Sequence, residues 1–159
     1  MKNKISRRSF LAAAAVSAAA LAVTGCDAKK SKKEVTDITV WNYYNGDQLE
    51  SFNRLVSTFN ETIGKAKGIR VTGSSQGTVN DLEANVMDAA QGKVGSAEMP
   101  TIFAAYADTA YKLDQMGMVV DLKDYLTEDE QAAFVPGYIT EGDFDGSGSI
   151  KIFPVAKST

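Results

Sequence analysis

The sequence predicts an α/β fold in which a mostly parallel sheet is flanked by helices. Short apolar segments that favour β-structure alternate along the chain with longer segments whose apolar residues recur every three or four positions. The order is strand, helix, strand, helix, strand, helix, which favours parallel strands joined by right-handed crossovers with helices on both faces. The roughly 125 residues after position 34 suffice for one core of ordinary size.

The first strand is predicted over residues 35–44, which are rich in apolar, β-favouring side chains and end at the turn-forming Asn45-Gly46. A helix is predicted from about Asp47, because its apolar residues fall on one face. These residues are Leu49, Phe52, Leu55, Val56, Phe59 and Ile63. Gly64 follows the last of them and is predicted to cap the helix at its C-terminus.

The second and third strands are predicted over residues 69–72 and 101–105. The second strand runs into a segment of glycine and serine, residues 73–77. The third is continuously apolar, which suits a strand covered on both faces. Between them, Thr78 and Asp81 predict a capping box that opens an amphipathic helix.

The remaining predicted elements are short. A third helix is expected over residues 109–116, and residues 119–122 form a brief extended piece. Thr127 and Glu130 predict a second capping box for a short helix. Because a proline cannot continue a helix, Pro136 is expected to end it.

In parallel sheets ligands bind beyond the carboxyl ends of the strands, which points to residues 41–47, 73–77 and 106–109. The first stretch interleaves three aromatic residues with two amides and a carboxylate. Aromatic faces stack on sugar rings, and amides and carboxylates form hydrogen bonds with hydroxyl groups. The candidate ligand residues of the first and third stretches are Trp41, Tyr43, Tyr44, Asn45, Tyr106 and Asp108. Alternatively, Trp41 fills the core between sheet and helix, and Tyr44 packs under the turn.

The second stretch, residues 73–77, precedes a helix N-terminus and contains the candidate ligand residue Ser75. Free backbone N–H groups at such a terminus can hold a phosphate or a carboxylate. The alternative is a plain connection between strand and helix. No Gly-Lys-Ser/Thr sequence follows, so the segment is not a P-loop.

Composition argues against an enzyme and against a nucleic-acid partner. The chain has no histidine, which excludes Ser-His-Asp and Cys-His arrangements, and a single cysteine, Cys26. From Glu34 onward there are 9 basic and 19 acidic residues, a net charge of −10, whereas nucleic-acid binding needs lysine and arginine to neutralise phosphate. We therefore predict that the protein is not an enzyme, has no nucleic-acid partner and needs no cofactor.

Residues 143–150 imitate the start of a calcium-binding loop. The twelfth position from Asp143 should be a glutamate that binds the ion through both oxygens, and here it is Pro154. A tight turn at Asp145-Gly146 explains the same residues. We predict no metal site.

Residues 1–25 are predicted to be a removable signal peptide, with four basic residues, no acidic ones and an apolar run at residues 10–23. That run is shorter than the roughly 20 residues a membrane-spanning helix needs. Residues 23–26 resemble a bacterial lipobox, which implies that Cys26 becomes a lipidated N-terminus. The alternative is an ordinary cut after Ala22.

Two further features belong to this N-terminal part. Residues 6–11 resemble a twin-arginine export motif, with a standard export signal as the alternative. Residues 26–34 read as a flexible tether after the lipidated cysteine. The tether contains four lysines, which would be attracted to anionic lipid headgroups at the membrane.

Four segments in order, residues 38–41, 99–108, 116–122 and 148–159, are similar to the first part of a carbohydrate-type, family 1 extracellular solute-binding protein of a bacterial ABC importer. The resemblance implies a monomeric, two-lobed clamp of the type II periplasmic-binding class. Such a protein sits lipid-anchored on the extracytoplasmic face of the membrane and delivers a carbohydrate to permease subunits.

The resemblance also implies where ligand contacts lie. They are expected around residues 41–45, at Tyr106 and Asp108, and at residues 157–159, which include Ser158. Family members are more than twice this length. Residues 35–159 are therefore expected to be a truncated first lobe, with the second lobe missing.

Overall fold

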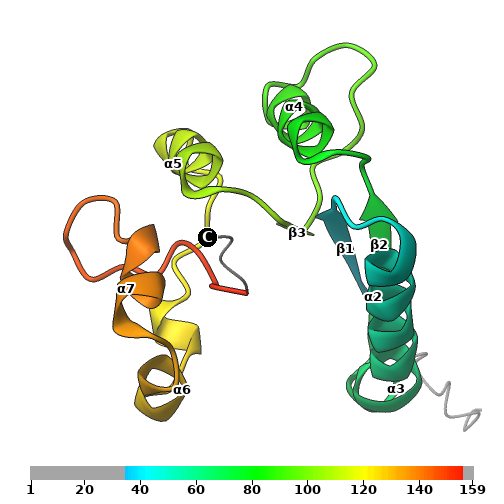
Figure 1. Cartoon of the computed structure of the whole chain (residues 1–159), viewed down its shortest axis with the longest axis horizontal. Helices are drawn as coiled ribbons and strands as arrows, with labels where there is room; N and C mark the ends of the chain where they lie inside the picture. The colour runs from blue at the N-terminus through cyan, green and yellow to red at the C-terminus, as the bar shows by residue number, and fades with distance from the viewer. Residues whose placement is uncertain (1–34, 156–159) are drawn as a thin grey trace, which may run out of the picture. The chain divides into compact units, whose positions relative to one another are not determined.

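A computed structural model describes residues 35–155 of the chain (Figure 1). Four predictions lie outside these residues: the signal peptide at 1–25, lipidation of Cys26, the tether at 26–34 and the ligand contact by Ser158. In the part of the chain that the structure describes, no helix is both long and apolar enough to cross a membrane.

The centre of the fold is a three-stranded parallel sheet, which confirms the predicted α/β class. Its strands are β1 (Thr36–Asn42), β2 (Ile69–Ser75) and β3 (Ile102–Phe103), and their spatial order is β2-β1-β3. Strand β1 therefore lies in the middle. The chain passes from β1 to β2 on one side of β1, and then from β2 to β3 on the other side of β1. Because crossovers between parallel strands are right-handed, these opposite directions place the connecting helices on opposite faces of the sheet.

The strand boundaries differ from the predicted ones. Strand β2 continues to Ser75, because residues 73–75 keep pairing with residues 40–42 of β1, so the predicted loop begins only at Gln76. Strand β1 ends at Asn42, two residues early. Strand β3 has two residues instead of five, because Thr101 bonds β1 through side chains: its N–H donates to Thr39 Oγ1 at 2.9 Å.

Helix α2 (Gly46–Phe59) does not end at Gly64 as predicted. It continues as a π-helix, η1 (Asn60–Gly64), and then as α3 (Lys65–Lys67), and the left-handed residue that ends it is Gly68, with φ 72°. Gly64 is buried with ordinary helical φ. A Cβ atom there would lie 2.6 Å from the carbonyl oxygen of Ile69, so glycine is required for close approach rather than as a cap.

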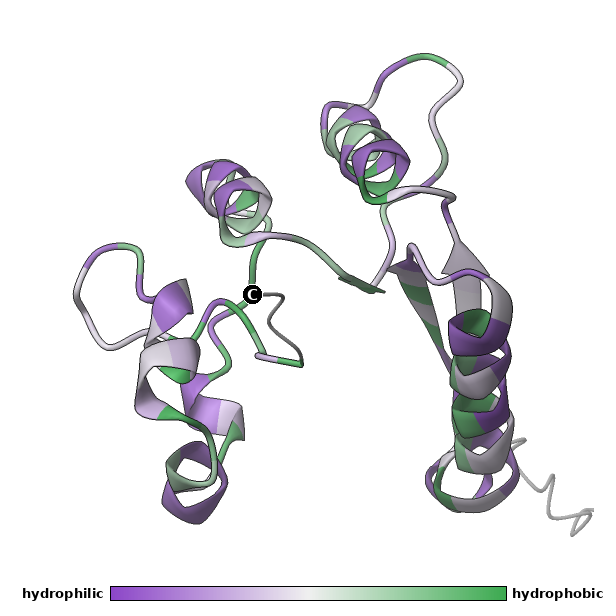
Figure 2. Cartoon of the chain, in the orientation of Figure 1, coloured by the Kyte–Doolittle hydropathy of each residue, from purple (hydrophilic) through white to green (hydrophobic). Residues whose placement is uncertain are grey.

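Helix α2 lies on one face of the sheet with only partial burial of its side chains. The Phe52 ring lies over Gly73, where a Cβ atom would be 2.5 Å from Phe52 Cε1. Two residues of the predicted apolar face, Leu55 and Ile63, are 70% and 54% exposed. Hydrophobic and hydrophilic residues alternate around α2, as expected of a helix that contacts the sheet along one side (Figure 2).

Helix α4 (Val79–Ala90) builds the core on the other face. Its predicted capping box is present, since Thr78 Oγ1 accepts from the N–H of Asp81 and the Asp81 carboxylate accepts from the N–H of Thr78. Leu82 and Val86 are fully buried, and they pack with Trp41 of β1 and with the fully buried Leu113 of α5 (Ala107–Gln115). Helix α5 begins two residues earlier than predicted.

Residues 119–155 form short elements: η2 (Lys123–Tyr125), α6 (Glu128–Ala132), α7 (Pro136–Ile139) and η3 (Thr140–Gly142). The predicted capping box of Thr127 and Glu130 is present. Pro136 does not end that helix, which stops at Ala132. It opens α7, because a proline lacks the N–H that the first helical residue would leave unpaired.

Side chains cap the backbone throughout this part of the chain. Asp121 accepts hydrogen bonds from the N–H groups of Lys123 and Ile150, which joins two segments distant in sequence. At the predicted turn, Asp145 accepts from the N–H of Ser147, and Gly146 adopts φ 74°. Within the described residues, no three His, Cys, Asp or Glu side chains are grouped to hold a metal ion.

Candidate functional site

The carboxyl ends of the three strands lie at the same edge of the sheet. The register aligns Trp41 with Ser74 of β2 and with Phe103 of β3. The N–H of Gln76 donates to the Asn42 carbonyl at 2.7 Å, and the N–H of Ala104 donates to the Trp41 carbonyl at 3.0 Å. The chain therefore leaves all three strands beside Trp41.

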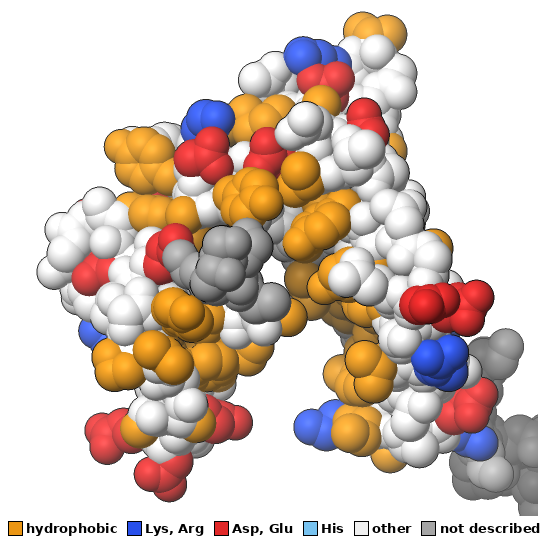
Figure 3. All heavy atoms as spheres, in the orientation of Figure 1, with side chains coloured by type: hydrophobic (Ala, Val, Ile, Leu, Met, Phe, Trp, Pro, Cys, Tyr) orange, Lys and Arg blue, Asp and Glu red, His pale blue; other side chains and the backbone are white. Residues whose placement is uncertain are grey.

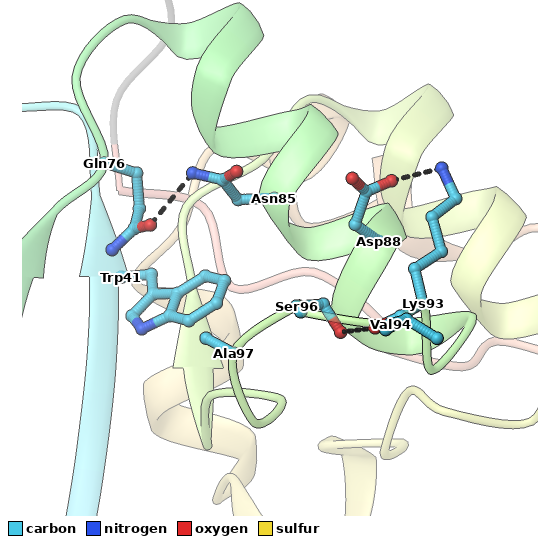
Figure 4. A pocket seen from close by; sticks show the side chains of 9 residues that line it. Trp41, Gln76, Asn85, Asp88, Lys93, Val94, Ser96 and Ala97 are labelled. Carbon is cyan, nitrogen blue, oxygen red and sulfur yellow. Dashed lines mark hydrogen bonds and ion pairs between the residues drawn. The ribbon is translucent and has the colours of Figure 1, made fainter.

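Trp41 belongs both to the core and to the surface beside it. It is 9% exposed and packs with Leu82, Val86 and Leu113, as the core alternative predicted. The same indole also lines an open pocket of about 330 Å³ (Figure 4). The two interpretations of Trp41 are thus compatible, with most of the ring in the core and one part at the pocket.

The next two aromatic residues have different surroundings. Tyr44 lies between Tyr43 and Phe52, with ring centroids 5.5 Å apart in both pairs. Tyr44 therefore packs within the protein, as its alternative predicted, but against Phe52 of α2 instead of under the turn. Tyr43 is exposed and presents an aromatic side chain to solvent at the carboxyl end of β1.

Two predicted ligand residues hold the edge of the sheet together. The Asn45 amide donates to the carbonyls of Tyr43 and Gly77, at 2.9 and 3.2 Å. Ser75 Oγ donates to the Tyr44 carbonyl at 2.9 Å. These bonds occupy the donors of both side chains and fix the loops after β1 and β2 to each other.

Asn42 adds a polar group in the interior. Its side chain is 2% exposed, and its Oδ1 accepts from the N–H of Tyr44 at 3.0 Å. The Nδ2 atom of Asn42 has no hydrogen-bond partner among the described residues. A buried donor without a partner destabilises a fold by about 1–3 kcal/mol, so this amide is an unusual feature at the end of the central strand.

The third stretch lies at the start of α5 and not at the end of a longer β3. Tyr106 is the N-cap residue of α5 and is exposed. Asp108 is in the first turn and forms an exposed ion pair with Lys112, 3.6 Å apart. A surface ion pair of this kind contributes little to stability. The Asp108 side chain is 68% exposed, so its carboxylate is accessible. Figure 3 shows hydrophobic side chains interspersed with charged ones on one face of the molecule.

The pocket beside Trp41 is lined by residues of α4 and of the loop that follows it, most of which the sequence analysis did not single out (Figure 4). The lining residues are Trp41, Gln76, Asn85, Asp88, Lys93, Val94, Gly95, Ser96 and Ala97. Apart from Trp41, only Gln76 belongs to one of the three stretches that the sequence predicted to line a site. The signal in the sequence was the spacing of Asn85 and Asp88, which puts two polar groups on one side of α4.

The polar groups of the pocket are paired with one another. Asn85 Nδ2 donates to Gln76 Oε1 at 3.1 Å, and Gln76 Nε2 donates to Ser74 Oγ at 3.0 Å. Asp88 and Lys93 form an ion pair, so their charges offset each other. The pocket therefore combines part of an aromatic face with amides and no net charge, which suits a neutral ligand rich in hydroxyl groups.

Hydrogen bonds also decide the charge at the start of α4. Bonds from the Thr78 hydroxyl and N–H lower the pKa of Asp81, which keeps this carboxylate ionised at neutral pH. Asp81 thereby occupies the helix N-terminus, where the predicted anion would bind. Hydrogen bonds likewise lower the carboxyl pKa of four other residues: Asp37, Asp121, Glu130 and Asp145.

No family model and no curated protein matches the sequence. The structure is similar to a cyclic α-maltosyl-1,6-maltose binding protein from Arthrobacter globiformis, with a TM-score of 0.58, 20% identity and coverage of 70% of this chain and 27% of that protein. It is also similar to CpMnBP1 with mannotriose bound, with a TM-score of 0.54, 15% identity and coverage of 72% and 27%.

A family 1 extracellular solute-binding protein from Bifidobacterium longum subsp. infantis has a TM-score of 0.50, 17% identity and coverage of 74% of this chain and 27% of that protein. The described residues have the fold of part of an extracellular solute-binding protein, so the predicted resemblance is confirmed for the fold. The chain spans about a quarter of the length of these solved proteins.

Proposed function

We propose that this chain is the first part of a substrate-binding lipoprotein that captures a sugar or oligosaccharide for an ABC importer. The observation that carries the proposal is the position of Trp41, which is the last residue but one of the central strand and lines an amide-bearing pocket without net charge. Two of the similar structures are of proteins that bind carbohydrates, a cyclic maltosyl-maltose in one case and mannotriose in the other. At the same edge of the sheet Tyr43 is exposed and suited to stacking on a sugar ring.

A neutral solute fits this edge better than a phosphorylated or acidic one. The ionised Asp81 carboxylate already occupies the α4 N-terminus and repels a second anion. Lys93, the cation of the pocket, is paired with Asp88. An anionic ligand would have to break that pair without gaining another positive partner in the pocket.

The proposed ligand set combines these groups with the residues taken from the resemblance. Trp41 and Tyr43 supply aromatic surface, and Tyr106 and Asp108 supply accessible polar groups at the start of α5. Asn45, Ser75 and Tyr44 act by holding the loops in position, because their polar atoms or rings are engaged within the protein. Ser158 remains a proposed contact.

A single lobe should bind weakly. It contacts one face of a ligand, while the loss of translational freedom on binding is the same as for a complete clamp. We expect dissociation constants of about 1 mM or weaker for this chain, against about 1 μM for a longer chain that also supplies a second lobe.

Fluorescence of Trp41, the only tryptophan, tests the proposal directly. Maltose-type and mannose-type oligosaccharides, sugar phosphates and dicarboxylates are titrated against the 159-residue chain and against the longer chain. Neutral oligosaccharides should change the emission, and Tyr43→Ala should weaken binding at least about tenfold, the equivalent of 1.4 kcal/mol. Tyr125→Ala, which removes an exposed tyrosine in η2, serves as the matched control.

The titration separates the competing functions. A response to sugar phosphates or dicarboxylates alone would favour a scaffold for acidic solutes. A longer chain that responds to no solute would favour a lipid-anchored protein that uses this lobe to contact other molecules. Tight sugar binding by the 159-residue chain would mean that the site lies within one lobe.

The proposal includes an extracytoplasmic location through a lipid on Cys26, a monomeric state and permease subunits as partners. The extracytoplasmic location and the lipid anchor are supported by the order of basic, apolar and cysteine residues in the first 26 positions. The Cys26→Ala variant should move from the membrane to the soluble fraction of cells. Mass spectrometry that finds an unmodified N-terminus at Leu21 or Val23 would rule out the lipid anchor.

A further inference from the structure

Strand β2 is an edge strand, because β1 lies on one side of it and no described strand lies on the other. In a parallel ladder, alternate residues direct both backbone groups to the same side. The N–H of Thr36 donates to the carbonyl of Gly68, so Gly68 and every second residue after it face β1. Val71 and Gly73 therefore direct their backbone groups outward, where another chain could pair with them.

The side chain of Asn60 occupies this edge at Val71. Asn60 Nδ2 donates to the Val71 carbonyl at 2.8 Å, and the Val71 N–H donates to Asn60 Oδ1 at 2.8 Å. One primary amide thus makes the two hydrogen bonds that a neighbouring strand would make. Both outward backbone groups of Val71 are engaged by this Asn60–Val71 pair.

The π-helix brings Asn60 to the strand. Asn60 is the first residue of η1, and Gly64 is the last. Gly64 lets the helix end approach the start of β2, because a Cβ atom there would lie 2.6 Å from the Ile69 carbonyl oxygen. A π-helical turn inserts a residue into an α-helix, which changes the direction of the side chains around it.

Helix α2 packs on the face of β2 beside this edge. The Phe52 ring lies over Gly73, a contact that compensates for the missing side chain of a glycine in an edge strand. The strand itself, Ile-Arg-Val-Thr-Gly-Ser-Ser, has seven residues and carries one charge, Arg70, which is paired with Asp37. Few features other than Asn60 would discourage pairing at this edge.

We propose that Asn60 blocks the edge of β2 and prevents the sheet from pairing with β2 of a second copy of the protein. A twofold arrangement would place the two identical β2 strands antiparallel, edge to edge, which requires free backbone groups at Val71. Asn60 removes those groups at a position near the middle of the strand.

The test replaces Asn60 with leucine, which has nearly the same shape but no hydrogen-bonding groups. Light scattering coupled to size-exclusion chromatography should give a doubled or larger mass for Asn60→Leu at concentrations where the unchanged chain has the monomer mass. The control is Asn53→Leu, the same substitution at an exposed position of α2. Adding Val71→Pro to Asn60→Leu should restore the monomer mass, because proline has no N–H to offer an edge partner.

Hydrogen exchange of the unchanged chain gives a second measurement that does not depend on a variant folding. The Val71 amide should exchange at least about tenfold more slowly than in an unstructured peptide, because Asn60 accepts its hydrogen bond. A Val71 amide that exchanges without protection would overturn the proposal. A folded Asn60→Leu protein with the monomer mass throughout would overturn it as well.

Discussion

The two faces of the sheet are stabilised in different ways. On the α4 face, large apolar side chains are fully buried: Leu82 and Val86 pack with Trp41 and Leu113. On the α2 face, none of the residues of α2, all of which the structure describes, is buried. There the helix approaches the strands closely at glycines and makes side-chain bonds to the backbone.

The difference shows where single changes should matter. A face held by apolar burial is sensitive to loss of volume, because a cavity forms when the neighbours relax only in part. A face held by close approach is sensitive to added volume, because an extra methyl group meets the backbone directly. The candidate site lies at the α4 face, where Trp41 is supported by the better-packed side of the molecule.

The largest expected effect is that of Leu82→Ala. Removing a fully buried leucine should lower the free energy of unfolding by about 2–5 kcal/mol. Leu55→Ala on the α2 face should change it by less than about 0.5 kcal/mol, because this leucine is 70% exposed. Urea denaturation followed by circular dichroism measures both. Equal effects of the two variants would contradict the difference between the faces.

Gly64→Ala should have the next largest effect, a loss of about 1–3 kcal/mol in the free energy of unfolding. The added Cβ atom would meet the Ile69 carbonyl oxygen and force η1 away from β2. Gly137→Ala in α7 is the control, since a Cβ atom there meets nothing within 4 Å. If Gly64→Ala were as stable as this control, the close approach of η1 to β2 would be unimportant.

Thr78→Ala should lower the free energy of unfolding by about 1 kcal/mol, the usual effect of removing an N-cap threonine. The variant loses the bond from the Asp81 N–H to Thr78 Oγ1, 3.2 Å, at the start of α4. Thr78→Ser, which keeps the hydroxyl, should be close to the unchanged chain in the same urea denaturation. A serine variant as unstable as the alanine one would show that the methyl group matters, not the bond.

The smallest effect is the acid dependence of this cap. Hydrogen bonds from Thr78 lower the pKa of Asp81 from 3.8, so the folded state favours the ionised carboxylate. Its contribution is present above pH 3.8 and is lost as the pH falls through the lower pKa of the folded state. The stability difference between the unchanged chain and Asp81→Ala should therefore be larger at about pH 6 than at about pH 2. A difference that is independent of pH would contradict this assignment.

Much of the fold follows from local patterns in the sequence. The alternation of apolar strands and amphipathic helices predicted the parallel sheet, and the spacing of Thr78 and Asp81 and of Thr127 and Glu130 predicted both capping boxes. Each capping box depends on two residues that are three positions apart, and each strand or helix on the spacing of nearby residues. A sequence records such relations directly, because the interacting groups have a constant separation along the chain.

The candidate site was only partly accessible to the same reasoning. The rule that ligands bind beyond strand ends led to Trp41, but not to Asn85, Asp88 or the loop after α4. Those residues reach Trp41 only because α4 packs across β1 and buries Leu82 beside it. Their polar character alone is equally typical of a solvated helix surface.

The sequence by itself determined the fold class, the two capping boxes and the aromatic residues at the end of the central strand. Only the tertiary structure decided that Gly64 serves close approach while Gly68 ends the helix, and that Ser75 continues a strand. It also decided that Asn60 bonds Val71 across a distance of eleven residues. In each case the deciding partner is a backbone group of another element, and a backbone group leaves no mark on the sequence beyond its own position.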